Sequence, residues 1–263
     1  MTRVPGIDEA ALRAALRGSK ASPDRDVAVH AEIDSTSDEL RRRLAAGAAG
    51  PGSIAIAGSQ TRGRGRLGRS WFSPGDGHLY VSLAVAVPGP AAELVPLVPL
   101  AAGAAAVDAL AQNGALGILL KWPNDLMRGD RKVGGILCEA FALGDRSAII
   151  VVGLGVNTGR SRFDEVLAGA AGCLGEGSGG PRPESVAGAW IFAIERWVAR
   201  LSSGDVAPLV AAWTDRAEPF GRRVRTAGIE GTTVGVDARG HLLIRTDTGD
   251  LEEVPGGIIE DAG

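Results

Sequence analysis

The amino-acid sequence predicts a mixed α+β domain over residues 1–217, with a largely antiparallel sheet and flanking helices, followed by a small all-β barrel over residues 218–263. One observation behind this prediction is that helical and strand-like apolar periodicities alternate as far as residue 217. A second is that after Pro219 only short strands recur, roughly one every ten residues, between glycine turns. A chain of 263 residues is long enough for a medium domain and a small one.

The N-terminal elements follow from their periodicity. An amphipathic helix is expected over residues 7–17, and residues 27–33 alternate as a strand. A helix then runs to about residue 46, and Thr36 with Glu39 three positions later fits a capping box at its start. Strands over residues 53–57 and 78–87 flank a loop rich in glycine and arginine that begins after Gln60.

The middle of the chain predicts a buried helix and a hairpin. Residues 94–112 are apolar, and Pro96, Pro99 and Asp108 among them favour a buried helix over a membrane span. A strand ends at Lys121. Residues 132–140 and 147–156 are rich in β-branched side chains and are joined by Gly144-Asp145, which predicts an antiparallel hairpin.

Helices and then strands complete the chain. Residues 184–202 carry Trp190 and Trp197 on an apolar stripe, which is typical of a helix that faces the core, and a further helix is expected over residues 206–216. The barrel strands are predicted over residues 222–226, 232–236, 242–246 and 251–254.

Composition excludes several classes of protein. The formal net charge is −3, so the molecule as a whole is not a nucleic-acid-binding polycation. Cys138 and Cys173 lack metal-ligand spacing, and the apolar run around Cys138 predicts a buried thiol in a reducing compartment. No signal-peptide pattern is found, so we expect a cytoplasmic protein that does not act at membranes. His30, His78 and His241 are far apart in sequence and predict neither a metal site nor a catalytic triad.

The most unusual segment is RGRGRLGR, residues 62–69, in which arginines alternate with glycines. In an extended chain Arg64 and Arg66 point the same way and Arg69 folds back, and guanidinium groups bind carboxylate and phosphate oxygens bidentately. Glycines leave such a loop flexible, at roughly 0.5–1 kcal/mol each relative to alanine. We therefore expect a loop that closes over an anion. An Arg-rich surface linker and an RGG-type RNA-binding segment stay open as alternatives.

Lysine is scarce, since only Lys20, Lys121 and Lys132 stand among the 28 basic residues. Lysines kept in an arginine-rich chain indicate positions that need a compact ammonium group. Lys121 opens the bend KWPND, where a lysine, an amide and a carboxylate suit a phosphate, metal or sugar, although an Asx turn explains Asn124-Asp125 equally well. Lys132 stands just before two glycines, which suits close approach to an anion.

Familiar nucleotide-binding motifs are weak or absent. The run GLGVNTG at residues 153–159 reads GxGxxxG rather than GxGxxG, and it has no acidic residue at the expected distance. No GxxxxGK[ST] occurs anywhere in the chain. The sequence therefore argues against a Rossmann domain and against a P-loop NTPase.

Motifs in register resemble those of biotin protein ligases, also called biotin–[acetyl-CoA-carboxylase] ligases. They are QxxGRGRxGRxW at residues 60–71, KWPND at 121–125, KxGGIL at 132–137 and GxGxN at 153–157. The run DSTS at residues 34–37 resembles the family's DSTN, with Ser37 in place of the usual asparagine. The resemblance implies a class II synthetase-like catalytic domain with an SH3-like C-terminal barrel.

The resemblance also implies a reaction in two steps. A carboxylate oxygen of biotin attacks the α-phosphorus of ATP, supplied with Mg²⁺, and gives biotinyl-5′-AMP and pyrophosphate. A lysine amine of the biotin carboxyl carrier protein then attacks the mixed anhydride and releases AMP. A cationic loop fits this chemistry, because it brings two anions together and shields the anhydride from water.

By the same resemblance, each ligand has its own set of residues. The implied catalytic residues are Arg66, Lys132 and Asp125, and Asp125 is also the candidate metal ligand. The implied biotin contacts are Ser35, Thr36, Gln60, Arg64, Gly65, Arg66 and Lys132. The implied contacts to ATP and the adenylate are Arg66, Arg69, Trp71, Lys121, Asn124, Lys132 and Asn157. Arg62 lies outside the matched pattern, and we expect it to be replaceable.

The remaining expectations concern DNA binding and alternative functions. Some family members carry an N-terminal DNA-binding domain, and about 26 residues before the first expected strand are too few for one, so we expect no specific DNA binding. A lipoate–protein ligase is the nearest alternative, since it shares the fold and the adenylation chemistry. A non-catalytic nucleotide- or RNA-binding module is the alternative from a different class.

Overall fold

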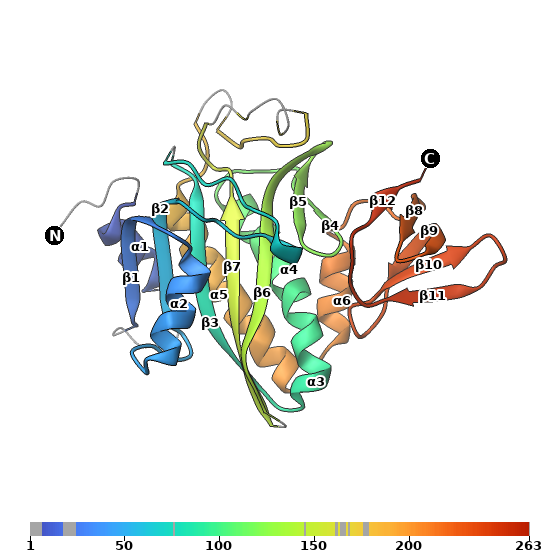
Figure 1. Ribbon diagram of the computed structural model, residues 1–263, viewed down its shortest axis with the longest axis horizontal. Helices are drawn as coiled ribbons and strands as arrows, with labels where there is room; N and C mark the ends of the chain where they lie inside the picture. The colour runs from blue at the N-terminus through green and yellow to red at the C-terminus, as the bar shows by residue number, and fades with distance from the viewer. Residues whose placement is uncertain are drawn as a thin grey trace.

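The fold is described from a computed structural model, for residues 7–17, 25–75, 77–144, 146–160, 163, 167, 169–175 and 179–262. A seven-stranded sheet with helices on both faces makes up the larger part, and a five-stranded sheet follows at the C-terminal end (Figure 1). Lys20 and Asp145, which the sequence analysis named, lie outside the described residues.

The large sheet is antiparallel except at one edge. Its order is β1-β2-β3-β7-β6-β5-β4. β1 and β2 are parallel, with α2 (Thr36–Ala45) as their crossover helix, and every other neighbouring pair is antiparallel. The predicted hairpin is confirmed as β6 and β7. The strands are β1 (Val27–Ile33), β2 (Ile54–Gln60), β3 (Leu79–Pro88), β4 (Leu119–Lys121), β5 (Asp125–Arg128), β6 (Arg131–Gly144) and β7 (Ser147–Val156).

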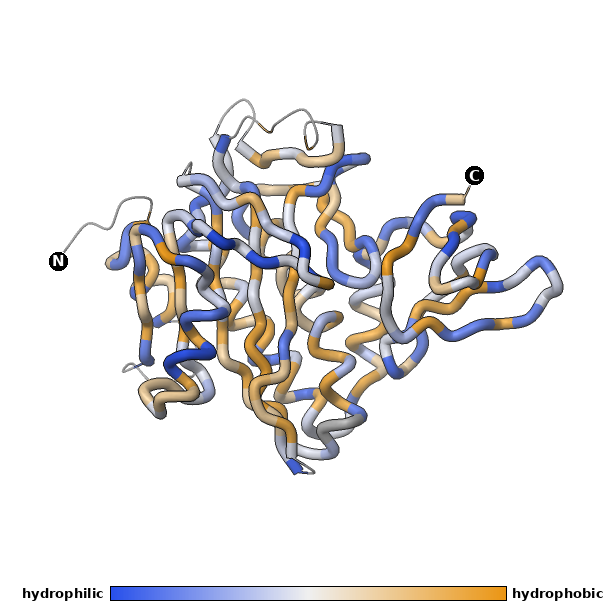
Figure 2. Tube along the Cα trace, in the orientation of Figure 1, coloured by the Kyte–Doolittle hydropathy of each residue, from blue (hydrophilic) through white to orange (hydrophobic). Residues whose placement is uncertain are grey.

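Neighbouring residues of one strand face different layers. Ile54 lies in the main core, whereas Ala55 packs against Leu40 and Leu44 of α2 on the other face of the sheet. This alternation is the period of two that strand geometry imposes. Apolar residues accordingly concentrate along the sheet and its covering helices, and polar residues concentrate in the loops (Figure 2). The helices of the main core are α1 (Glu9–Leu16), α4 (Val98–Gln112), α5 (Pro183–Ser202) and α6 (Ala207–Thr214).

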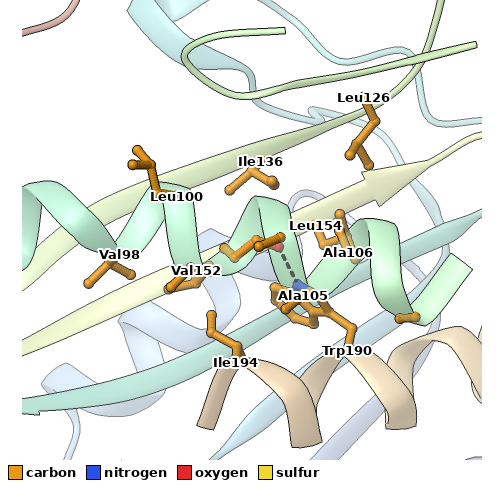
Figure 3. Close-up of a cluster of buried hydrophobic side chains, with 14 of the residues drawn as sticks. Val98, Leu100, Ala105, Ala106, Leu126, Ile136, Val152, Leu154, Trp190 and Ile194 are labelled. Atoms are coloured by element: carbon orange, nitrogen blue, oxygen red, sulfur yellow. Dashed lines mark hydrogen bonds between the residues drawn. The ribbon is translucent and has the colours of Figure 1, made fainter. Parts of the chain in front are cut away.

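Helix α4 lies at the centre of the main core (Figure 3). Trp190 and Ile194 of α5 pack on one side of it, and strand residues such as Ile136 pack on the other. The buried Trp190 indole N–H donates to the Ala102 carbonyl oxygen at 3.1 Å, which satisfies its one polar atom. Val95–Gln112 is the one described segment long and apolar enough to cross a membrane, and 67% of it is buried inside the protein.

The start of this central helix differs from the prediction, which ran unbroken from residue 94. The structure instead has a short helix α3 (Ala91–Leu94), a 3-10 turn η2 (Val95–Leu97) and then α4. Pro96 lies in the 3-10 turn and Pro99 in the first turn of α4. Because proline has no N–H to donate to a preceding turn, it fits helix starts and interrupts a longer helix.

The cap of helix α2 also differs from the prediction. Ser35, not Thr36, is the N-cap residue, and its hydroxyl accepts a hydrogen bond from the Asp38 N–H at 3.4 Å. Ser35 and Asp38 have the same spacing as Thr36 and Glu39, so the sequence pattern fits both pairs. The Thr36 hydroxyl is consequently free for bonds within the fold.

The C-terminal sheet has one strand more than predicted. Its order is β11-β10-β9-β8-β12, and all described pairings are antiparallel. Val224 and Ile244 of this sheet belong to the main core, and the Trp122 indole donates to the Gly240 carbonyl oxygen at 3.1 Å. The two sheets therefore share one core. The strands are β8 (Arg223–Thr226), β9 (Ile229–Val236), β10 (Leu242–Thr246), β11 (Leu251–Val254) and β12 (Glu260–Asp261).

Candidate functional site

A cavity of about 250 Å³ lies where the separated motifs meet. It is bounded by the start of α2, by the loop between β2 and β3, and by the turn between β4 and β5. Residues of strands β6 and β7 also line it. Every site residue implied by the resemblance lines it except Asn157. These lining residues are Ser35, Thr36, Gln60, Arg64, Gly65, Arg66, Arg69, Trp71, Lys121, Asn124, Asp125 and Lys132.

The Gly/Arg loop, residues 61–70, folds back on itself. The Gly65 N–H donates to the Arg69 carbonyl oxygen at 2.7 Å, and a 3-10 turn η1 (Arg66–Gly68) reverses the chain. A Cβ added at Gly63 would lie 2.4 Å from a backbone carbonyl oxygen, so a side chain is excluded there. The extended conformation assumed from the sequence is therefore wrong for residues 66–68.

The arginines of the loop have different partners. Arg64 donates to Asp38 on α2 and to Glu139 on β6, and so ties the loop to both elements. Arg66 Nη1 instead donates to Asn124 Oδ1 at 3.0 Å. Burial opposes the charge of Arg64, but its hydrogen bond to Asp38 and the charge of Glu139 raise its pKa above the usual range. Arg64 and Arg66 do not act as a parallel pair in this structure.

Lys132 lies between a carboxylate and an indole. Its Nζ is 2.6 Å from Asp125 Oδ1 and 5.5 Å from the centre of the Trp71 ring. Gly135 and Gly155 face each other across β6 and β7, and a Cβ at Gly155 would lie 2.7 Å from the indole nitrogen. These glycines make room for the indole on the sheet surface. The GxG run thus lies in an antiparallel strand, in agreement with the argument against a Rossmann domain.

Asn124 and the C-terminal segment close another side of the cavity. The Asn124 amide donates to the Ile136 carbonyl oxygen at 2.9 Å, which directs its own oxygen toward Arg66. Lys121 Nζ is 3.6 Å from Asp261 Oδ2 on β12. Residues 257–259, just before β12, also line the cavity. Sequence reasoning missed them, because they join the site through tertiary packing and carry no motif.

Hydroxyl and amide groups form the floor of the cavity and the layer directly behind it, and we call this set the hydroxyl network. Thr36, Ser37 and Gln60 line the cavity, and Ser73 and Ser82 lie behind them and form hydrogen bonds with them. The Thr36 and Ser37 hydroxyl oxygens lie 2.9 Å and 3.0 Å from that of Ser82. Gln60 Nε2 donates to Ser73 Oγ at 2.9 Å. Ser73 and Ser82 were missed from the sequence, although a serine inside the apolar strand LYVSLAVAV was a visible signal.

Asn157 and Cys138 differ from expectation. Asn157 is only 4% exposed, and its amide donates to the Gly172 carbonyl oxygen at 2.8 Å, so it fastens a neighbouring loop rather than facing the cavity. A buried thiol was predicted for Cys138, but the residue is half-buried, whereas Cys173 is buried. Burial nevertheless raises the pKa of the Cys138 thiol to about 12, so the thiol stays protonated at neutral pH.

One group of possible metal ligands lies in the C-terminal sheet, outside the cavity lining. Asp237, His241 and Glu253 have ligand atoms within 4.8 Å of one another. Arg239 forms ion pairs with both carboxylates, so a guanidinium already neutralises them. Within the described residues, His241 is thus the one histidine that lies in a group of possible metal ligands.

The chain matches two protein-family models. Residues 29–157 match the biotin/lipoate A/B protein ligase family, and this range holds most of the cavity lining. Residues 220–260 match the biotin protein ligase C terminal domain, which corresponds to the C-terminal sheet.

Individual proteins are similar over most of the chain. A biotin–[acetyl-CoA-carboxylase] ligase of Paracoccus denitrificans is 35% identical over 229 residues, which cover 83% of this chain and 94% of that protein. The bifunctional ligase/repressor BirA of Escherichia coli is 33% identical over 227 residues, covering 84% of this chain and 70% of the relative. The structure of Aquifex aeolicus biotin protein ligase in complex with biotin and ATP superposes with a TM-score of 0.77 at 25% identity, covering 90% and 99% of the two chains.

Proposed function

Because the chain belongs to the biotin/lipoate A/B protein ligase family, we propose that it is a biotin–[acetyl-CoA-carboxylase] ligase. It uses ATP to attach biotin, through biotinyl-5′-AMP, to a lysine of the biotin carboxyl carrier protein. One observation carries this proposal: a neutral floor of hydroxyl and amide groups shares one cavity with a cationic rim, which consists of Arg64, Arg66, Arg69, Lys121 and Lys132. Biotin needs both, since it has a neutral ureido ring at one end and a carboxylate at the other.

Arg66 and Lys132 are the residues we assign to the first step. A carboxylate oxygen of biotin attacks the α-phosphorus, the bond to the bridging oxygen breaks, and pyrophosphate leaves. Two anions have to approach each other, so cations at the place of developing charge stabilise the transition state. In the structure Arg66 is held by Asn124, and Lys132 is held by Asp125. When the substrates bind, we expect their oxygens to replace Asp125 as the partners of the Lys132 ammonium group.

The nucleotide is assigned to the side of the cavity beneath the loop. Trp71 Nε1 is buried with no hydrogen-bond partner among the described residues, and a nucleotide oxygen would supply one. Arg69 and Lys121 line the same cavity and provide charge for the phosphates. Asn157 lies behind this surface, so we propose that its role toward the adenylate is indirect.

Asp125 fits the Mg²⁺ that accompanies ATP. It is the one acidic residue among those that line the cavity, and carboxylate oxygens are ligands that Mg²⁺ prefers. When bound there, the ion would neutralise charge on the phosphates. Asp125 has a second role without the ion, because it orients the Lys132 ammonium.

The second step requires shielding from water until the carrier lysine arrives. That amine attacks the acyl carbon of the anhydride, the bond to the phosphate oxygen breaks, and AMP leaves while the amine loses a proton. The Gly/Arg loop and residues 257–259 both line the cavity. We propose that the C-terminal sheet is an SH3-like barrel, and that it supplies this second wall.

Exchange of labelled pyrophosphate into ATP tests the proposal. Biotin should drive exchange in the purified chain, and lipoate at the same concentration should not, because its dithiolane ring cannot satisfy the hydroxyl network. Exchange driven by lipoate alone would favour the lipoate–protein ligase. No exchange with either acid would favour a non-catalytic nucleotide- or RNA-binding module.

Expectations about DNA and location stay predictions. A gel shift with operator DNA should show no sequence-specific complex, and such a complex would contradict the expectation of a ligase without repressor activity. A cytoplasmic location, away from membranes, follows from the composition and not from the fold.

A further inference from the structure

We propose that Ser82 is a positioning residue that completes the hydrogen-bonding polarity of the cavity floor by donating to Thr36, and thereby supports the selection of a cyclic urea. The inference rests on the proposed function and deepens it, since it explains how biotin is distinguished from other ring acids. Ser82 is 0% exposed and does not line the cavity, so it acts only through its neighbours.

The orientation of the Gln60 amide is fixed from both of its ends. Its Oε1 lies 2.9 Å from the backbone nitrogen of Thr36, and a backbone N–H can only donate. At the other end, Nε2 lies 2.9 Å from Ser73 Oγ, whose own proton is donated to the Trp71 carbonyl oxygen at 3.0 Å. A carbonyl can only accept, so Ser73 must accept from Gln60. The amide therefore has its oxygen toward Thr36.

The fixed amide then determines where each hydroxyl proton points. Thr36 Oγ1 is 3.2 Å from Gln60 Oε1, which can only accept, so Thr36 donates its single proton there. Ser82, 2.9 Å from Thr36 Oγ1, must donate to it, because Thr36 has no second proton. Ser37, 3.0 Å from Ser82 Oγ, must in turn donate to Ser82. The hydroxyl protons of these three residues thus run from Ser37 through Ser82 and Thr36 to Gln60 Oε1.

This direction decides what the floor offers to a ligand. Thr36 lines the cavity with its proton already used, so toward a ligand it acts only as an acceptor. Ser35 accepts from the Asp38 N–H, and no hydrogen bond in the described part of the chain uses its proton, which leaves Ser35 as a donor. Gln60 keeps a second amide proton. The floor therefore presents donors beside an acceptor.

A cyclic urea matches that pattern. Its carbonyl oxygen accepts from the donors, Ser35 and Gln60, and a ring N–H donates to Thr36. A dithiolane ring has neither group and would leave the floor unsatisfied in a buried place, which is unfavourable. Gln60 fixes the direction of the hydroxyl protons, and Ser82 completes the chain because its hydroxyl accepts from Ser37 and donates to Thr36. Without Ser82, the Thr36 oxygen loses its donor on the protein side, so the lone pair that it offers to a ligand is no longer oriented.

The test compares Ser82→Ala with Ser53→Ala by calorimetric titration of biotin into the purified full chain. Both remove a buried serine hydroxyl, but Ser53 lies outside the cavity lining and accepts from the Gly50 N–H, whereas Ser82 touches Thr36. We expect the biotin Kd to rise about tenfold for Ser82→Ala and about twofold or less for Ser53→Ala, which is the scale of losing one hydrogen-bonding partner. Desthiobiotin, which keeps the ureido ring and lacks the sulfur, should show the same ratio.

Kinetics and a conservative variant complete the test. Pyrophosphate exchange by Ser82→Ala should show a raised KM for biotin, an unchanged kcat and an unchanged KM for ATP, and Ser82→Thr should restore binding. Equal losses in the two alanine variants, or a fall in kcat alone, would reduce Ser82 to a structural hydroxyl and overturn the inference. Failure of the wild-type chain to bind biotin would instead overturn the proposed function.

Discussion

The floor and the rim of the cavity differ in burial and in charge. Floor groups such as Thr36 and Ser82 are at most 4% exposed, and they are tolerated there because they are neutral and satisfy one another. The rim cation Lys132 keeps about a third of its side chain exposed, at 34%, and is held by the carboxylate of Asp125. Buried charge is far more costly than buried hydroxyl. We propose that the floor determines which ring is bound and that the rim determines how fast its carboxylate reacts.

The largest effect is expected at the rim, from Lys132→Ala. Losing the ammonium should lower kcat for biotin-dependent exchange about a hundredfold or more, with a smaller change in KM for biotin, because the charge acts mainly on the transition state. Lys132→Arg should recover only part of the activity, since a planar guanidinium does not replace a compact ammonium. Activity within threefold of wild type for Lys132→Ala would remove Lys132 from the reaction.

The second-largest effect is expected from Gly155→Ala, which adds a methyl group beside the rim. The new Cβ would lie 2.7 Å from the Trp71 indole nitrogen, so the indole would have to leave the surface that supports Lys132. We expect Gly155→Ala to raise the KM for ATP about tenfold. Gly235→Ala is the matched control, because it also lies in a strand and a Cβ there meets nothing within 4 Å. Equal kinetics in both variants would show that the Trp71 position does not matter.

Arg64→Met should loosen the loop without removing a floor contact. Its ion pairs with Asp38 and Glu139 are partly solvated, so together they are worth on the order of 1 kcal/mol. Amide hydrogen exchange over residues 65–69 should therefore become several-fold faster, and the adenylate should leak more readily. Arg62→Ala is the control, because Arg62 is 77% exposed and pairs only with Asp34 among the described residues. Unchanged amide hydrogen exchange in Arg64→Met would show that these two ion pairs do not stabilise the loop.

The smallest effect is expected from Asp34→Asn, outside the cavity lining. Hydrogen bonds from Arg42, from the Ser35 N–H and from Arg62 hold the pKa of Asp34 well below its usual range. A lowered pKa stabilises the fold fully above the unfolded value of about 4, and this stabilisation is lost progressively as the pH falls from there toward the folded value. The Tm difference between wild type and Asp34→Asn should therefore be present at pH 7 and shrink below about pH 4. A difference that grew on acidification would contradict this sign.

Local periodicity predicted most elements of the large sheet but could not predict how they are assembled. The strand over residues 27–33 and the β6–β7 hairpin are confirmed, because alternation and a short turn are visible in sequence. That β7 lies between β3 and β6 depends on pairings between distant segments. β12 has only two residues, too few to show a period.

The site residues divide in the same way, into those that local motifs predict and those that depend on contacts between distant segments. The residues implied by the motifs were found from sequence, and the structure brings all of them except Asn157 to one cavity. Ser82 and residues 257–259 were missed, since their roles arise from contacts with segments far away in the sequence. The orientation of Arg64 was missed for a similar reason, because its partners, Asp38 and Glu139, lie on other elements.

The division between floor and rim is tested most directly by one titration of biotin, in pyrophosphate exchange, with wild type, Ser82→Ala and Lys132→Ala side by side. We predict that the floor variant raises KM for biotin about tenfold at an unchanged kcat, and that the rim variant lowers kcat about a hundredfold or more with little change in KM. Variants that both changed the same parameter, or that exchanged these effects, would contradict the account.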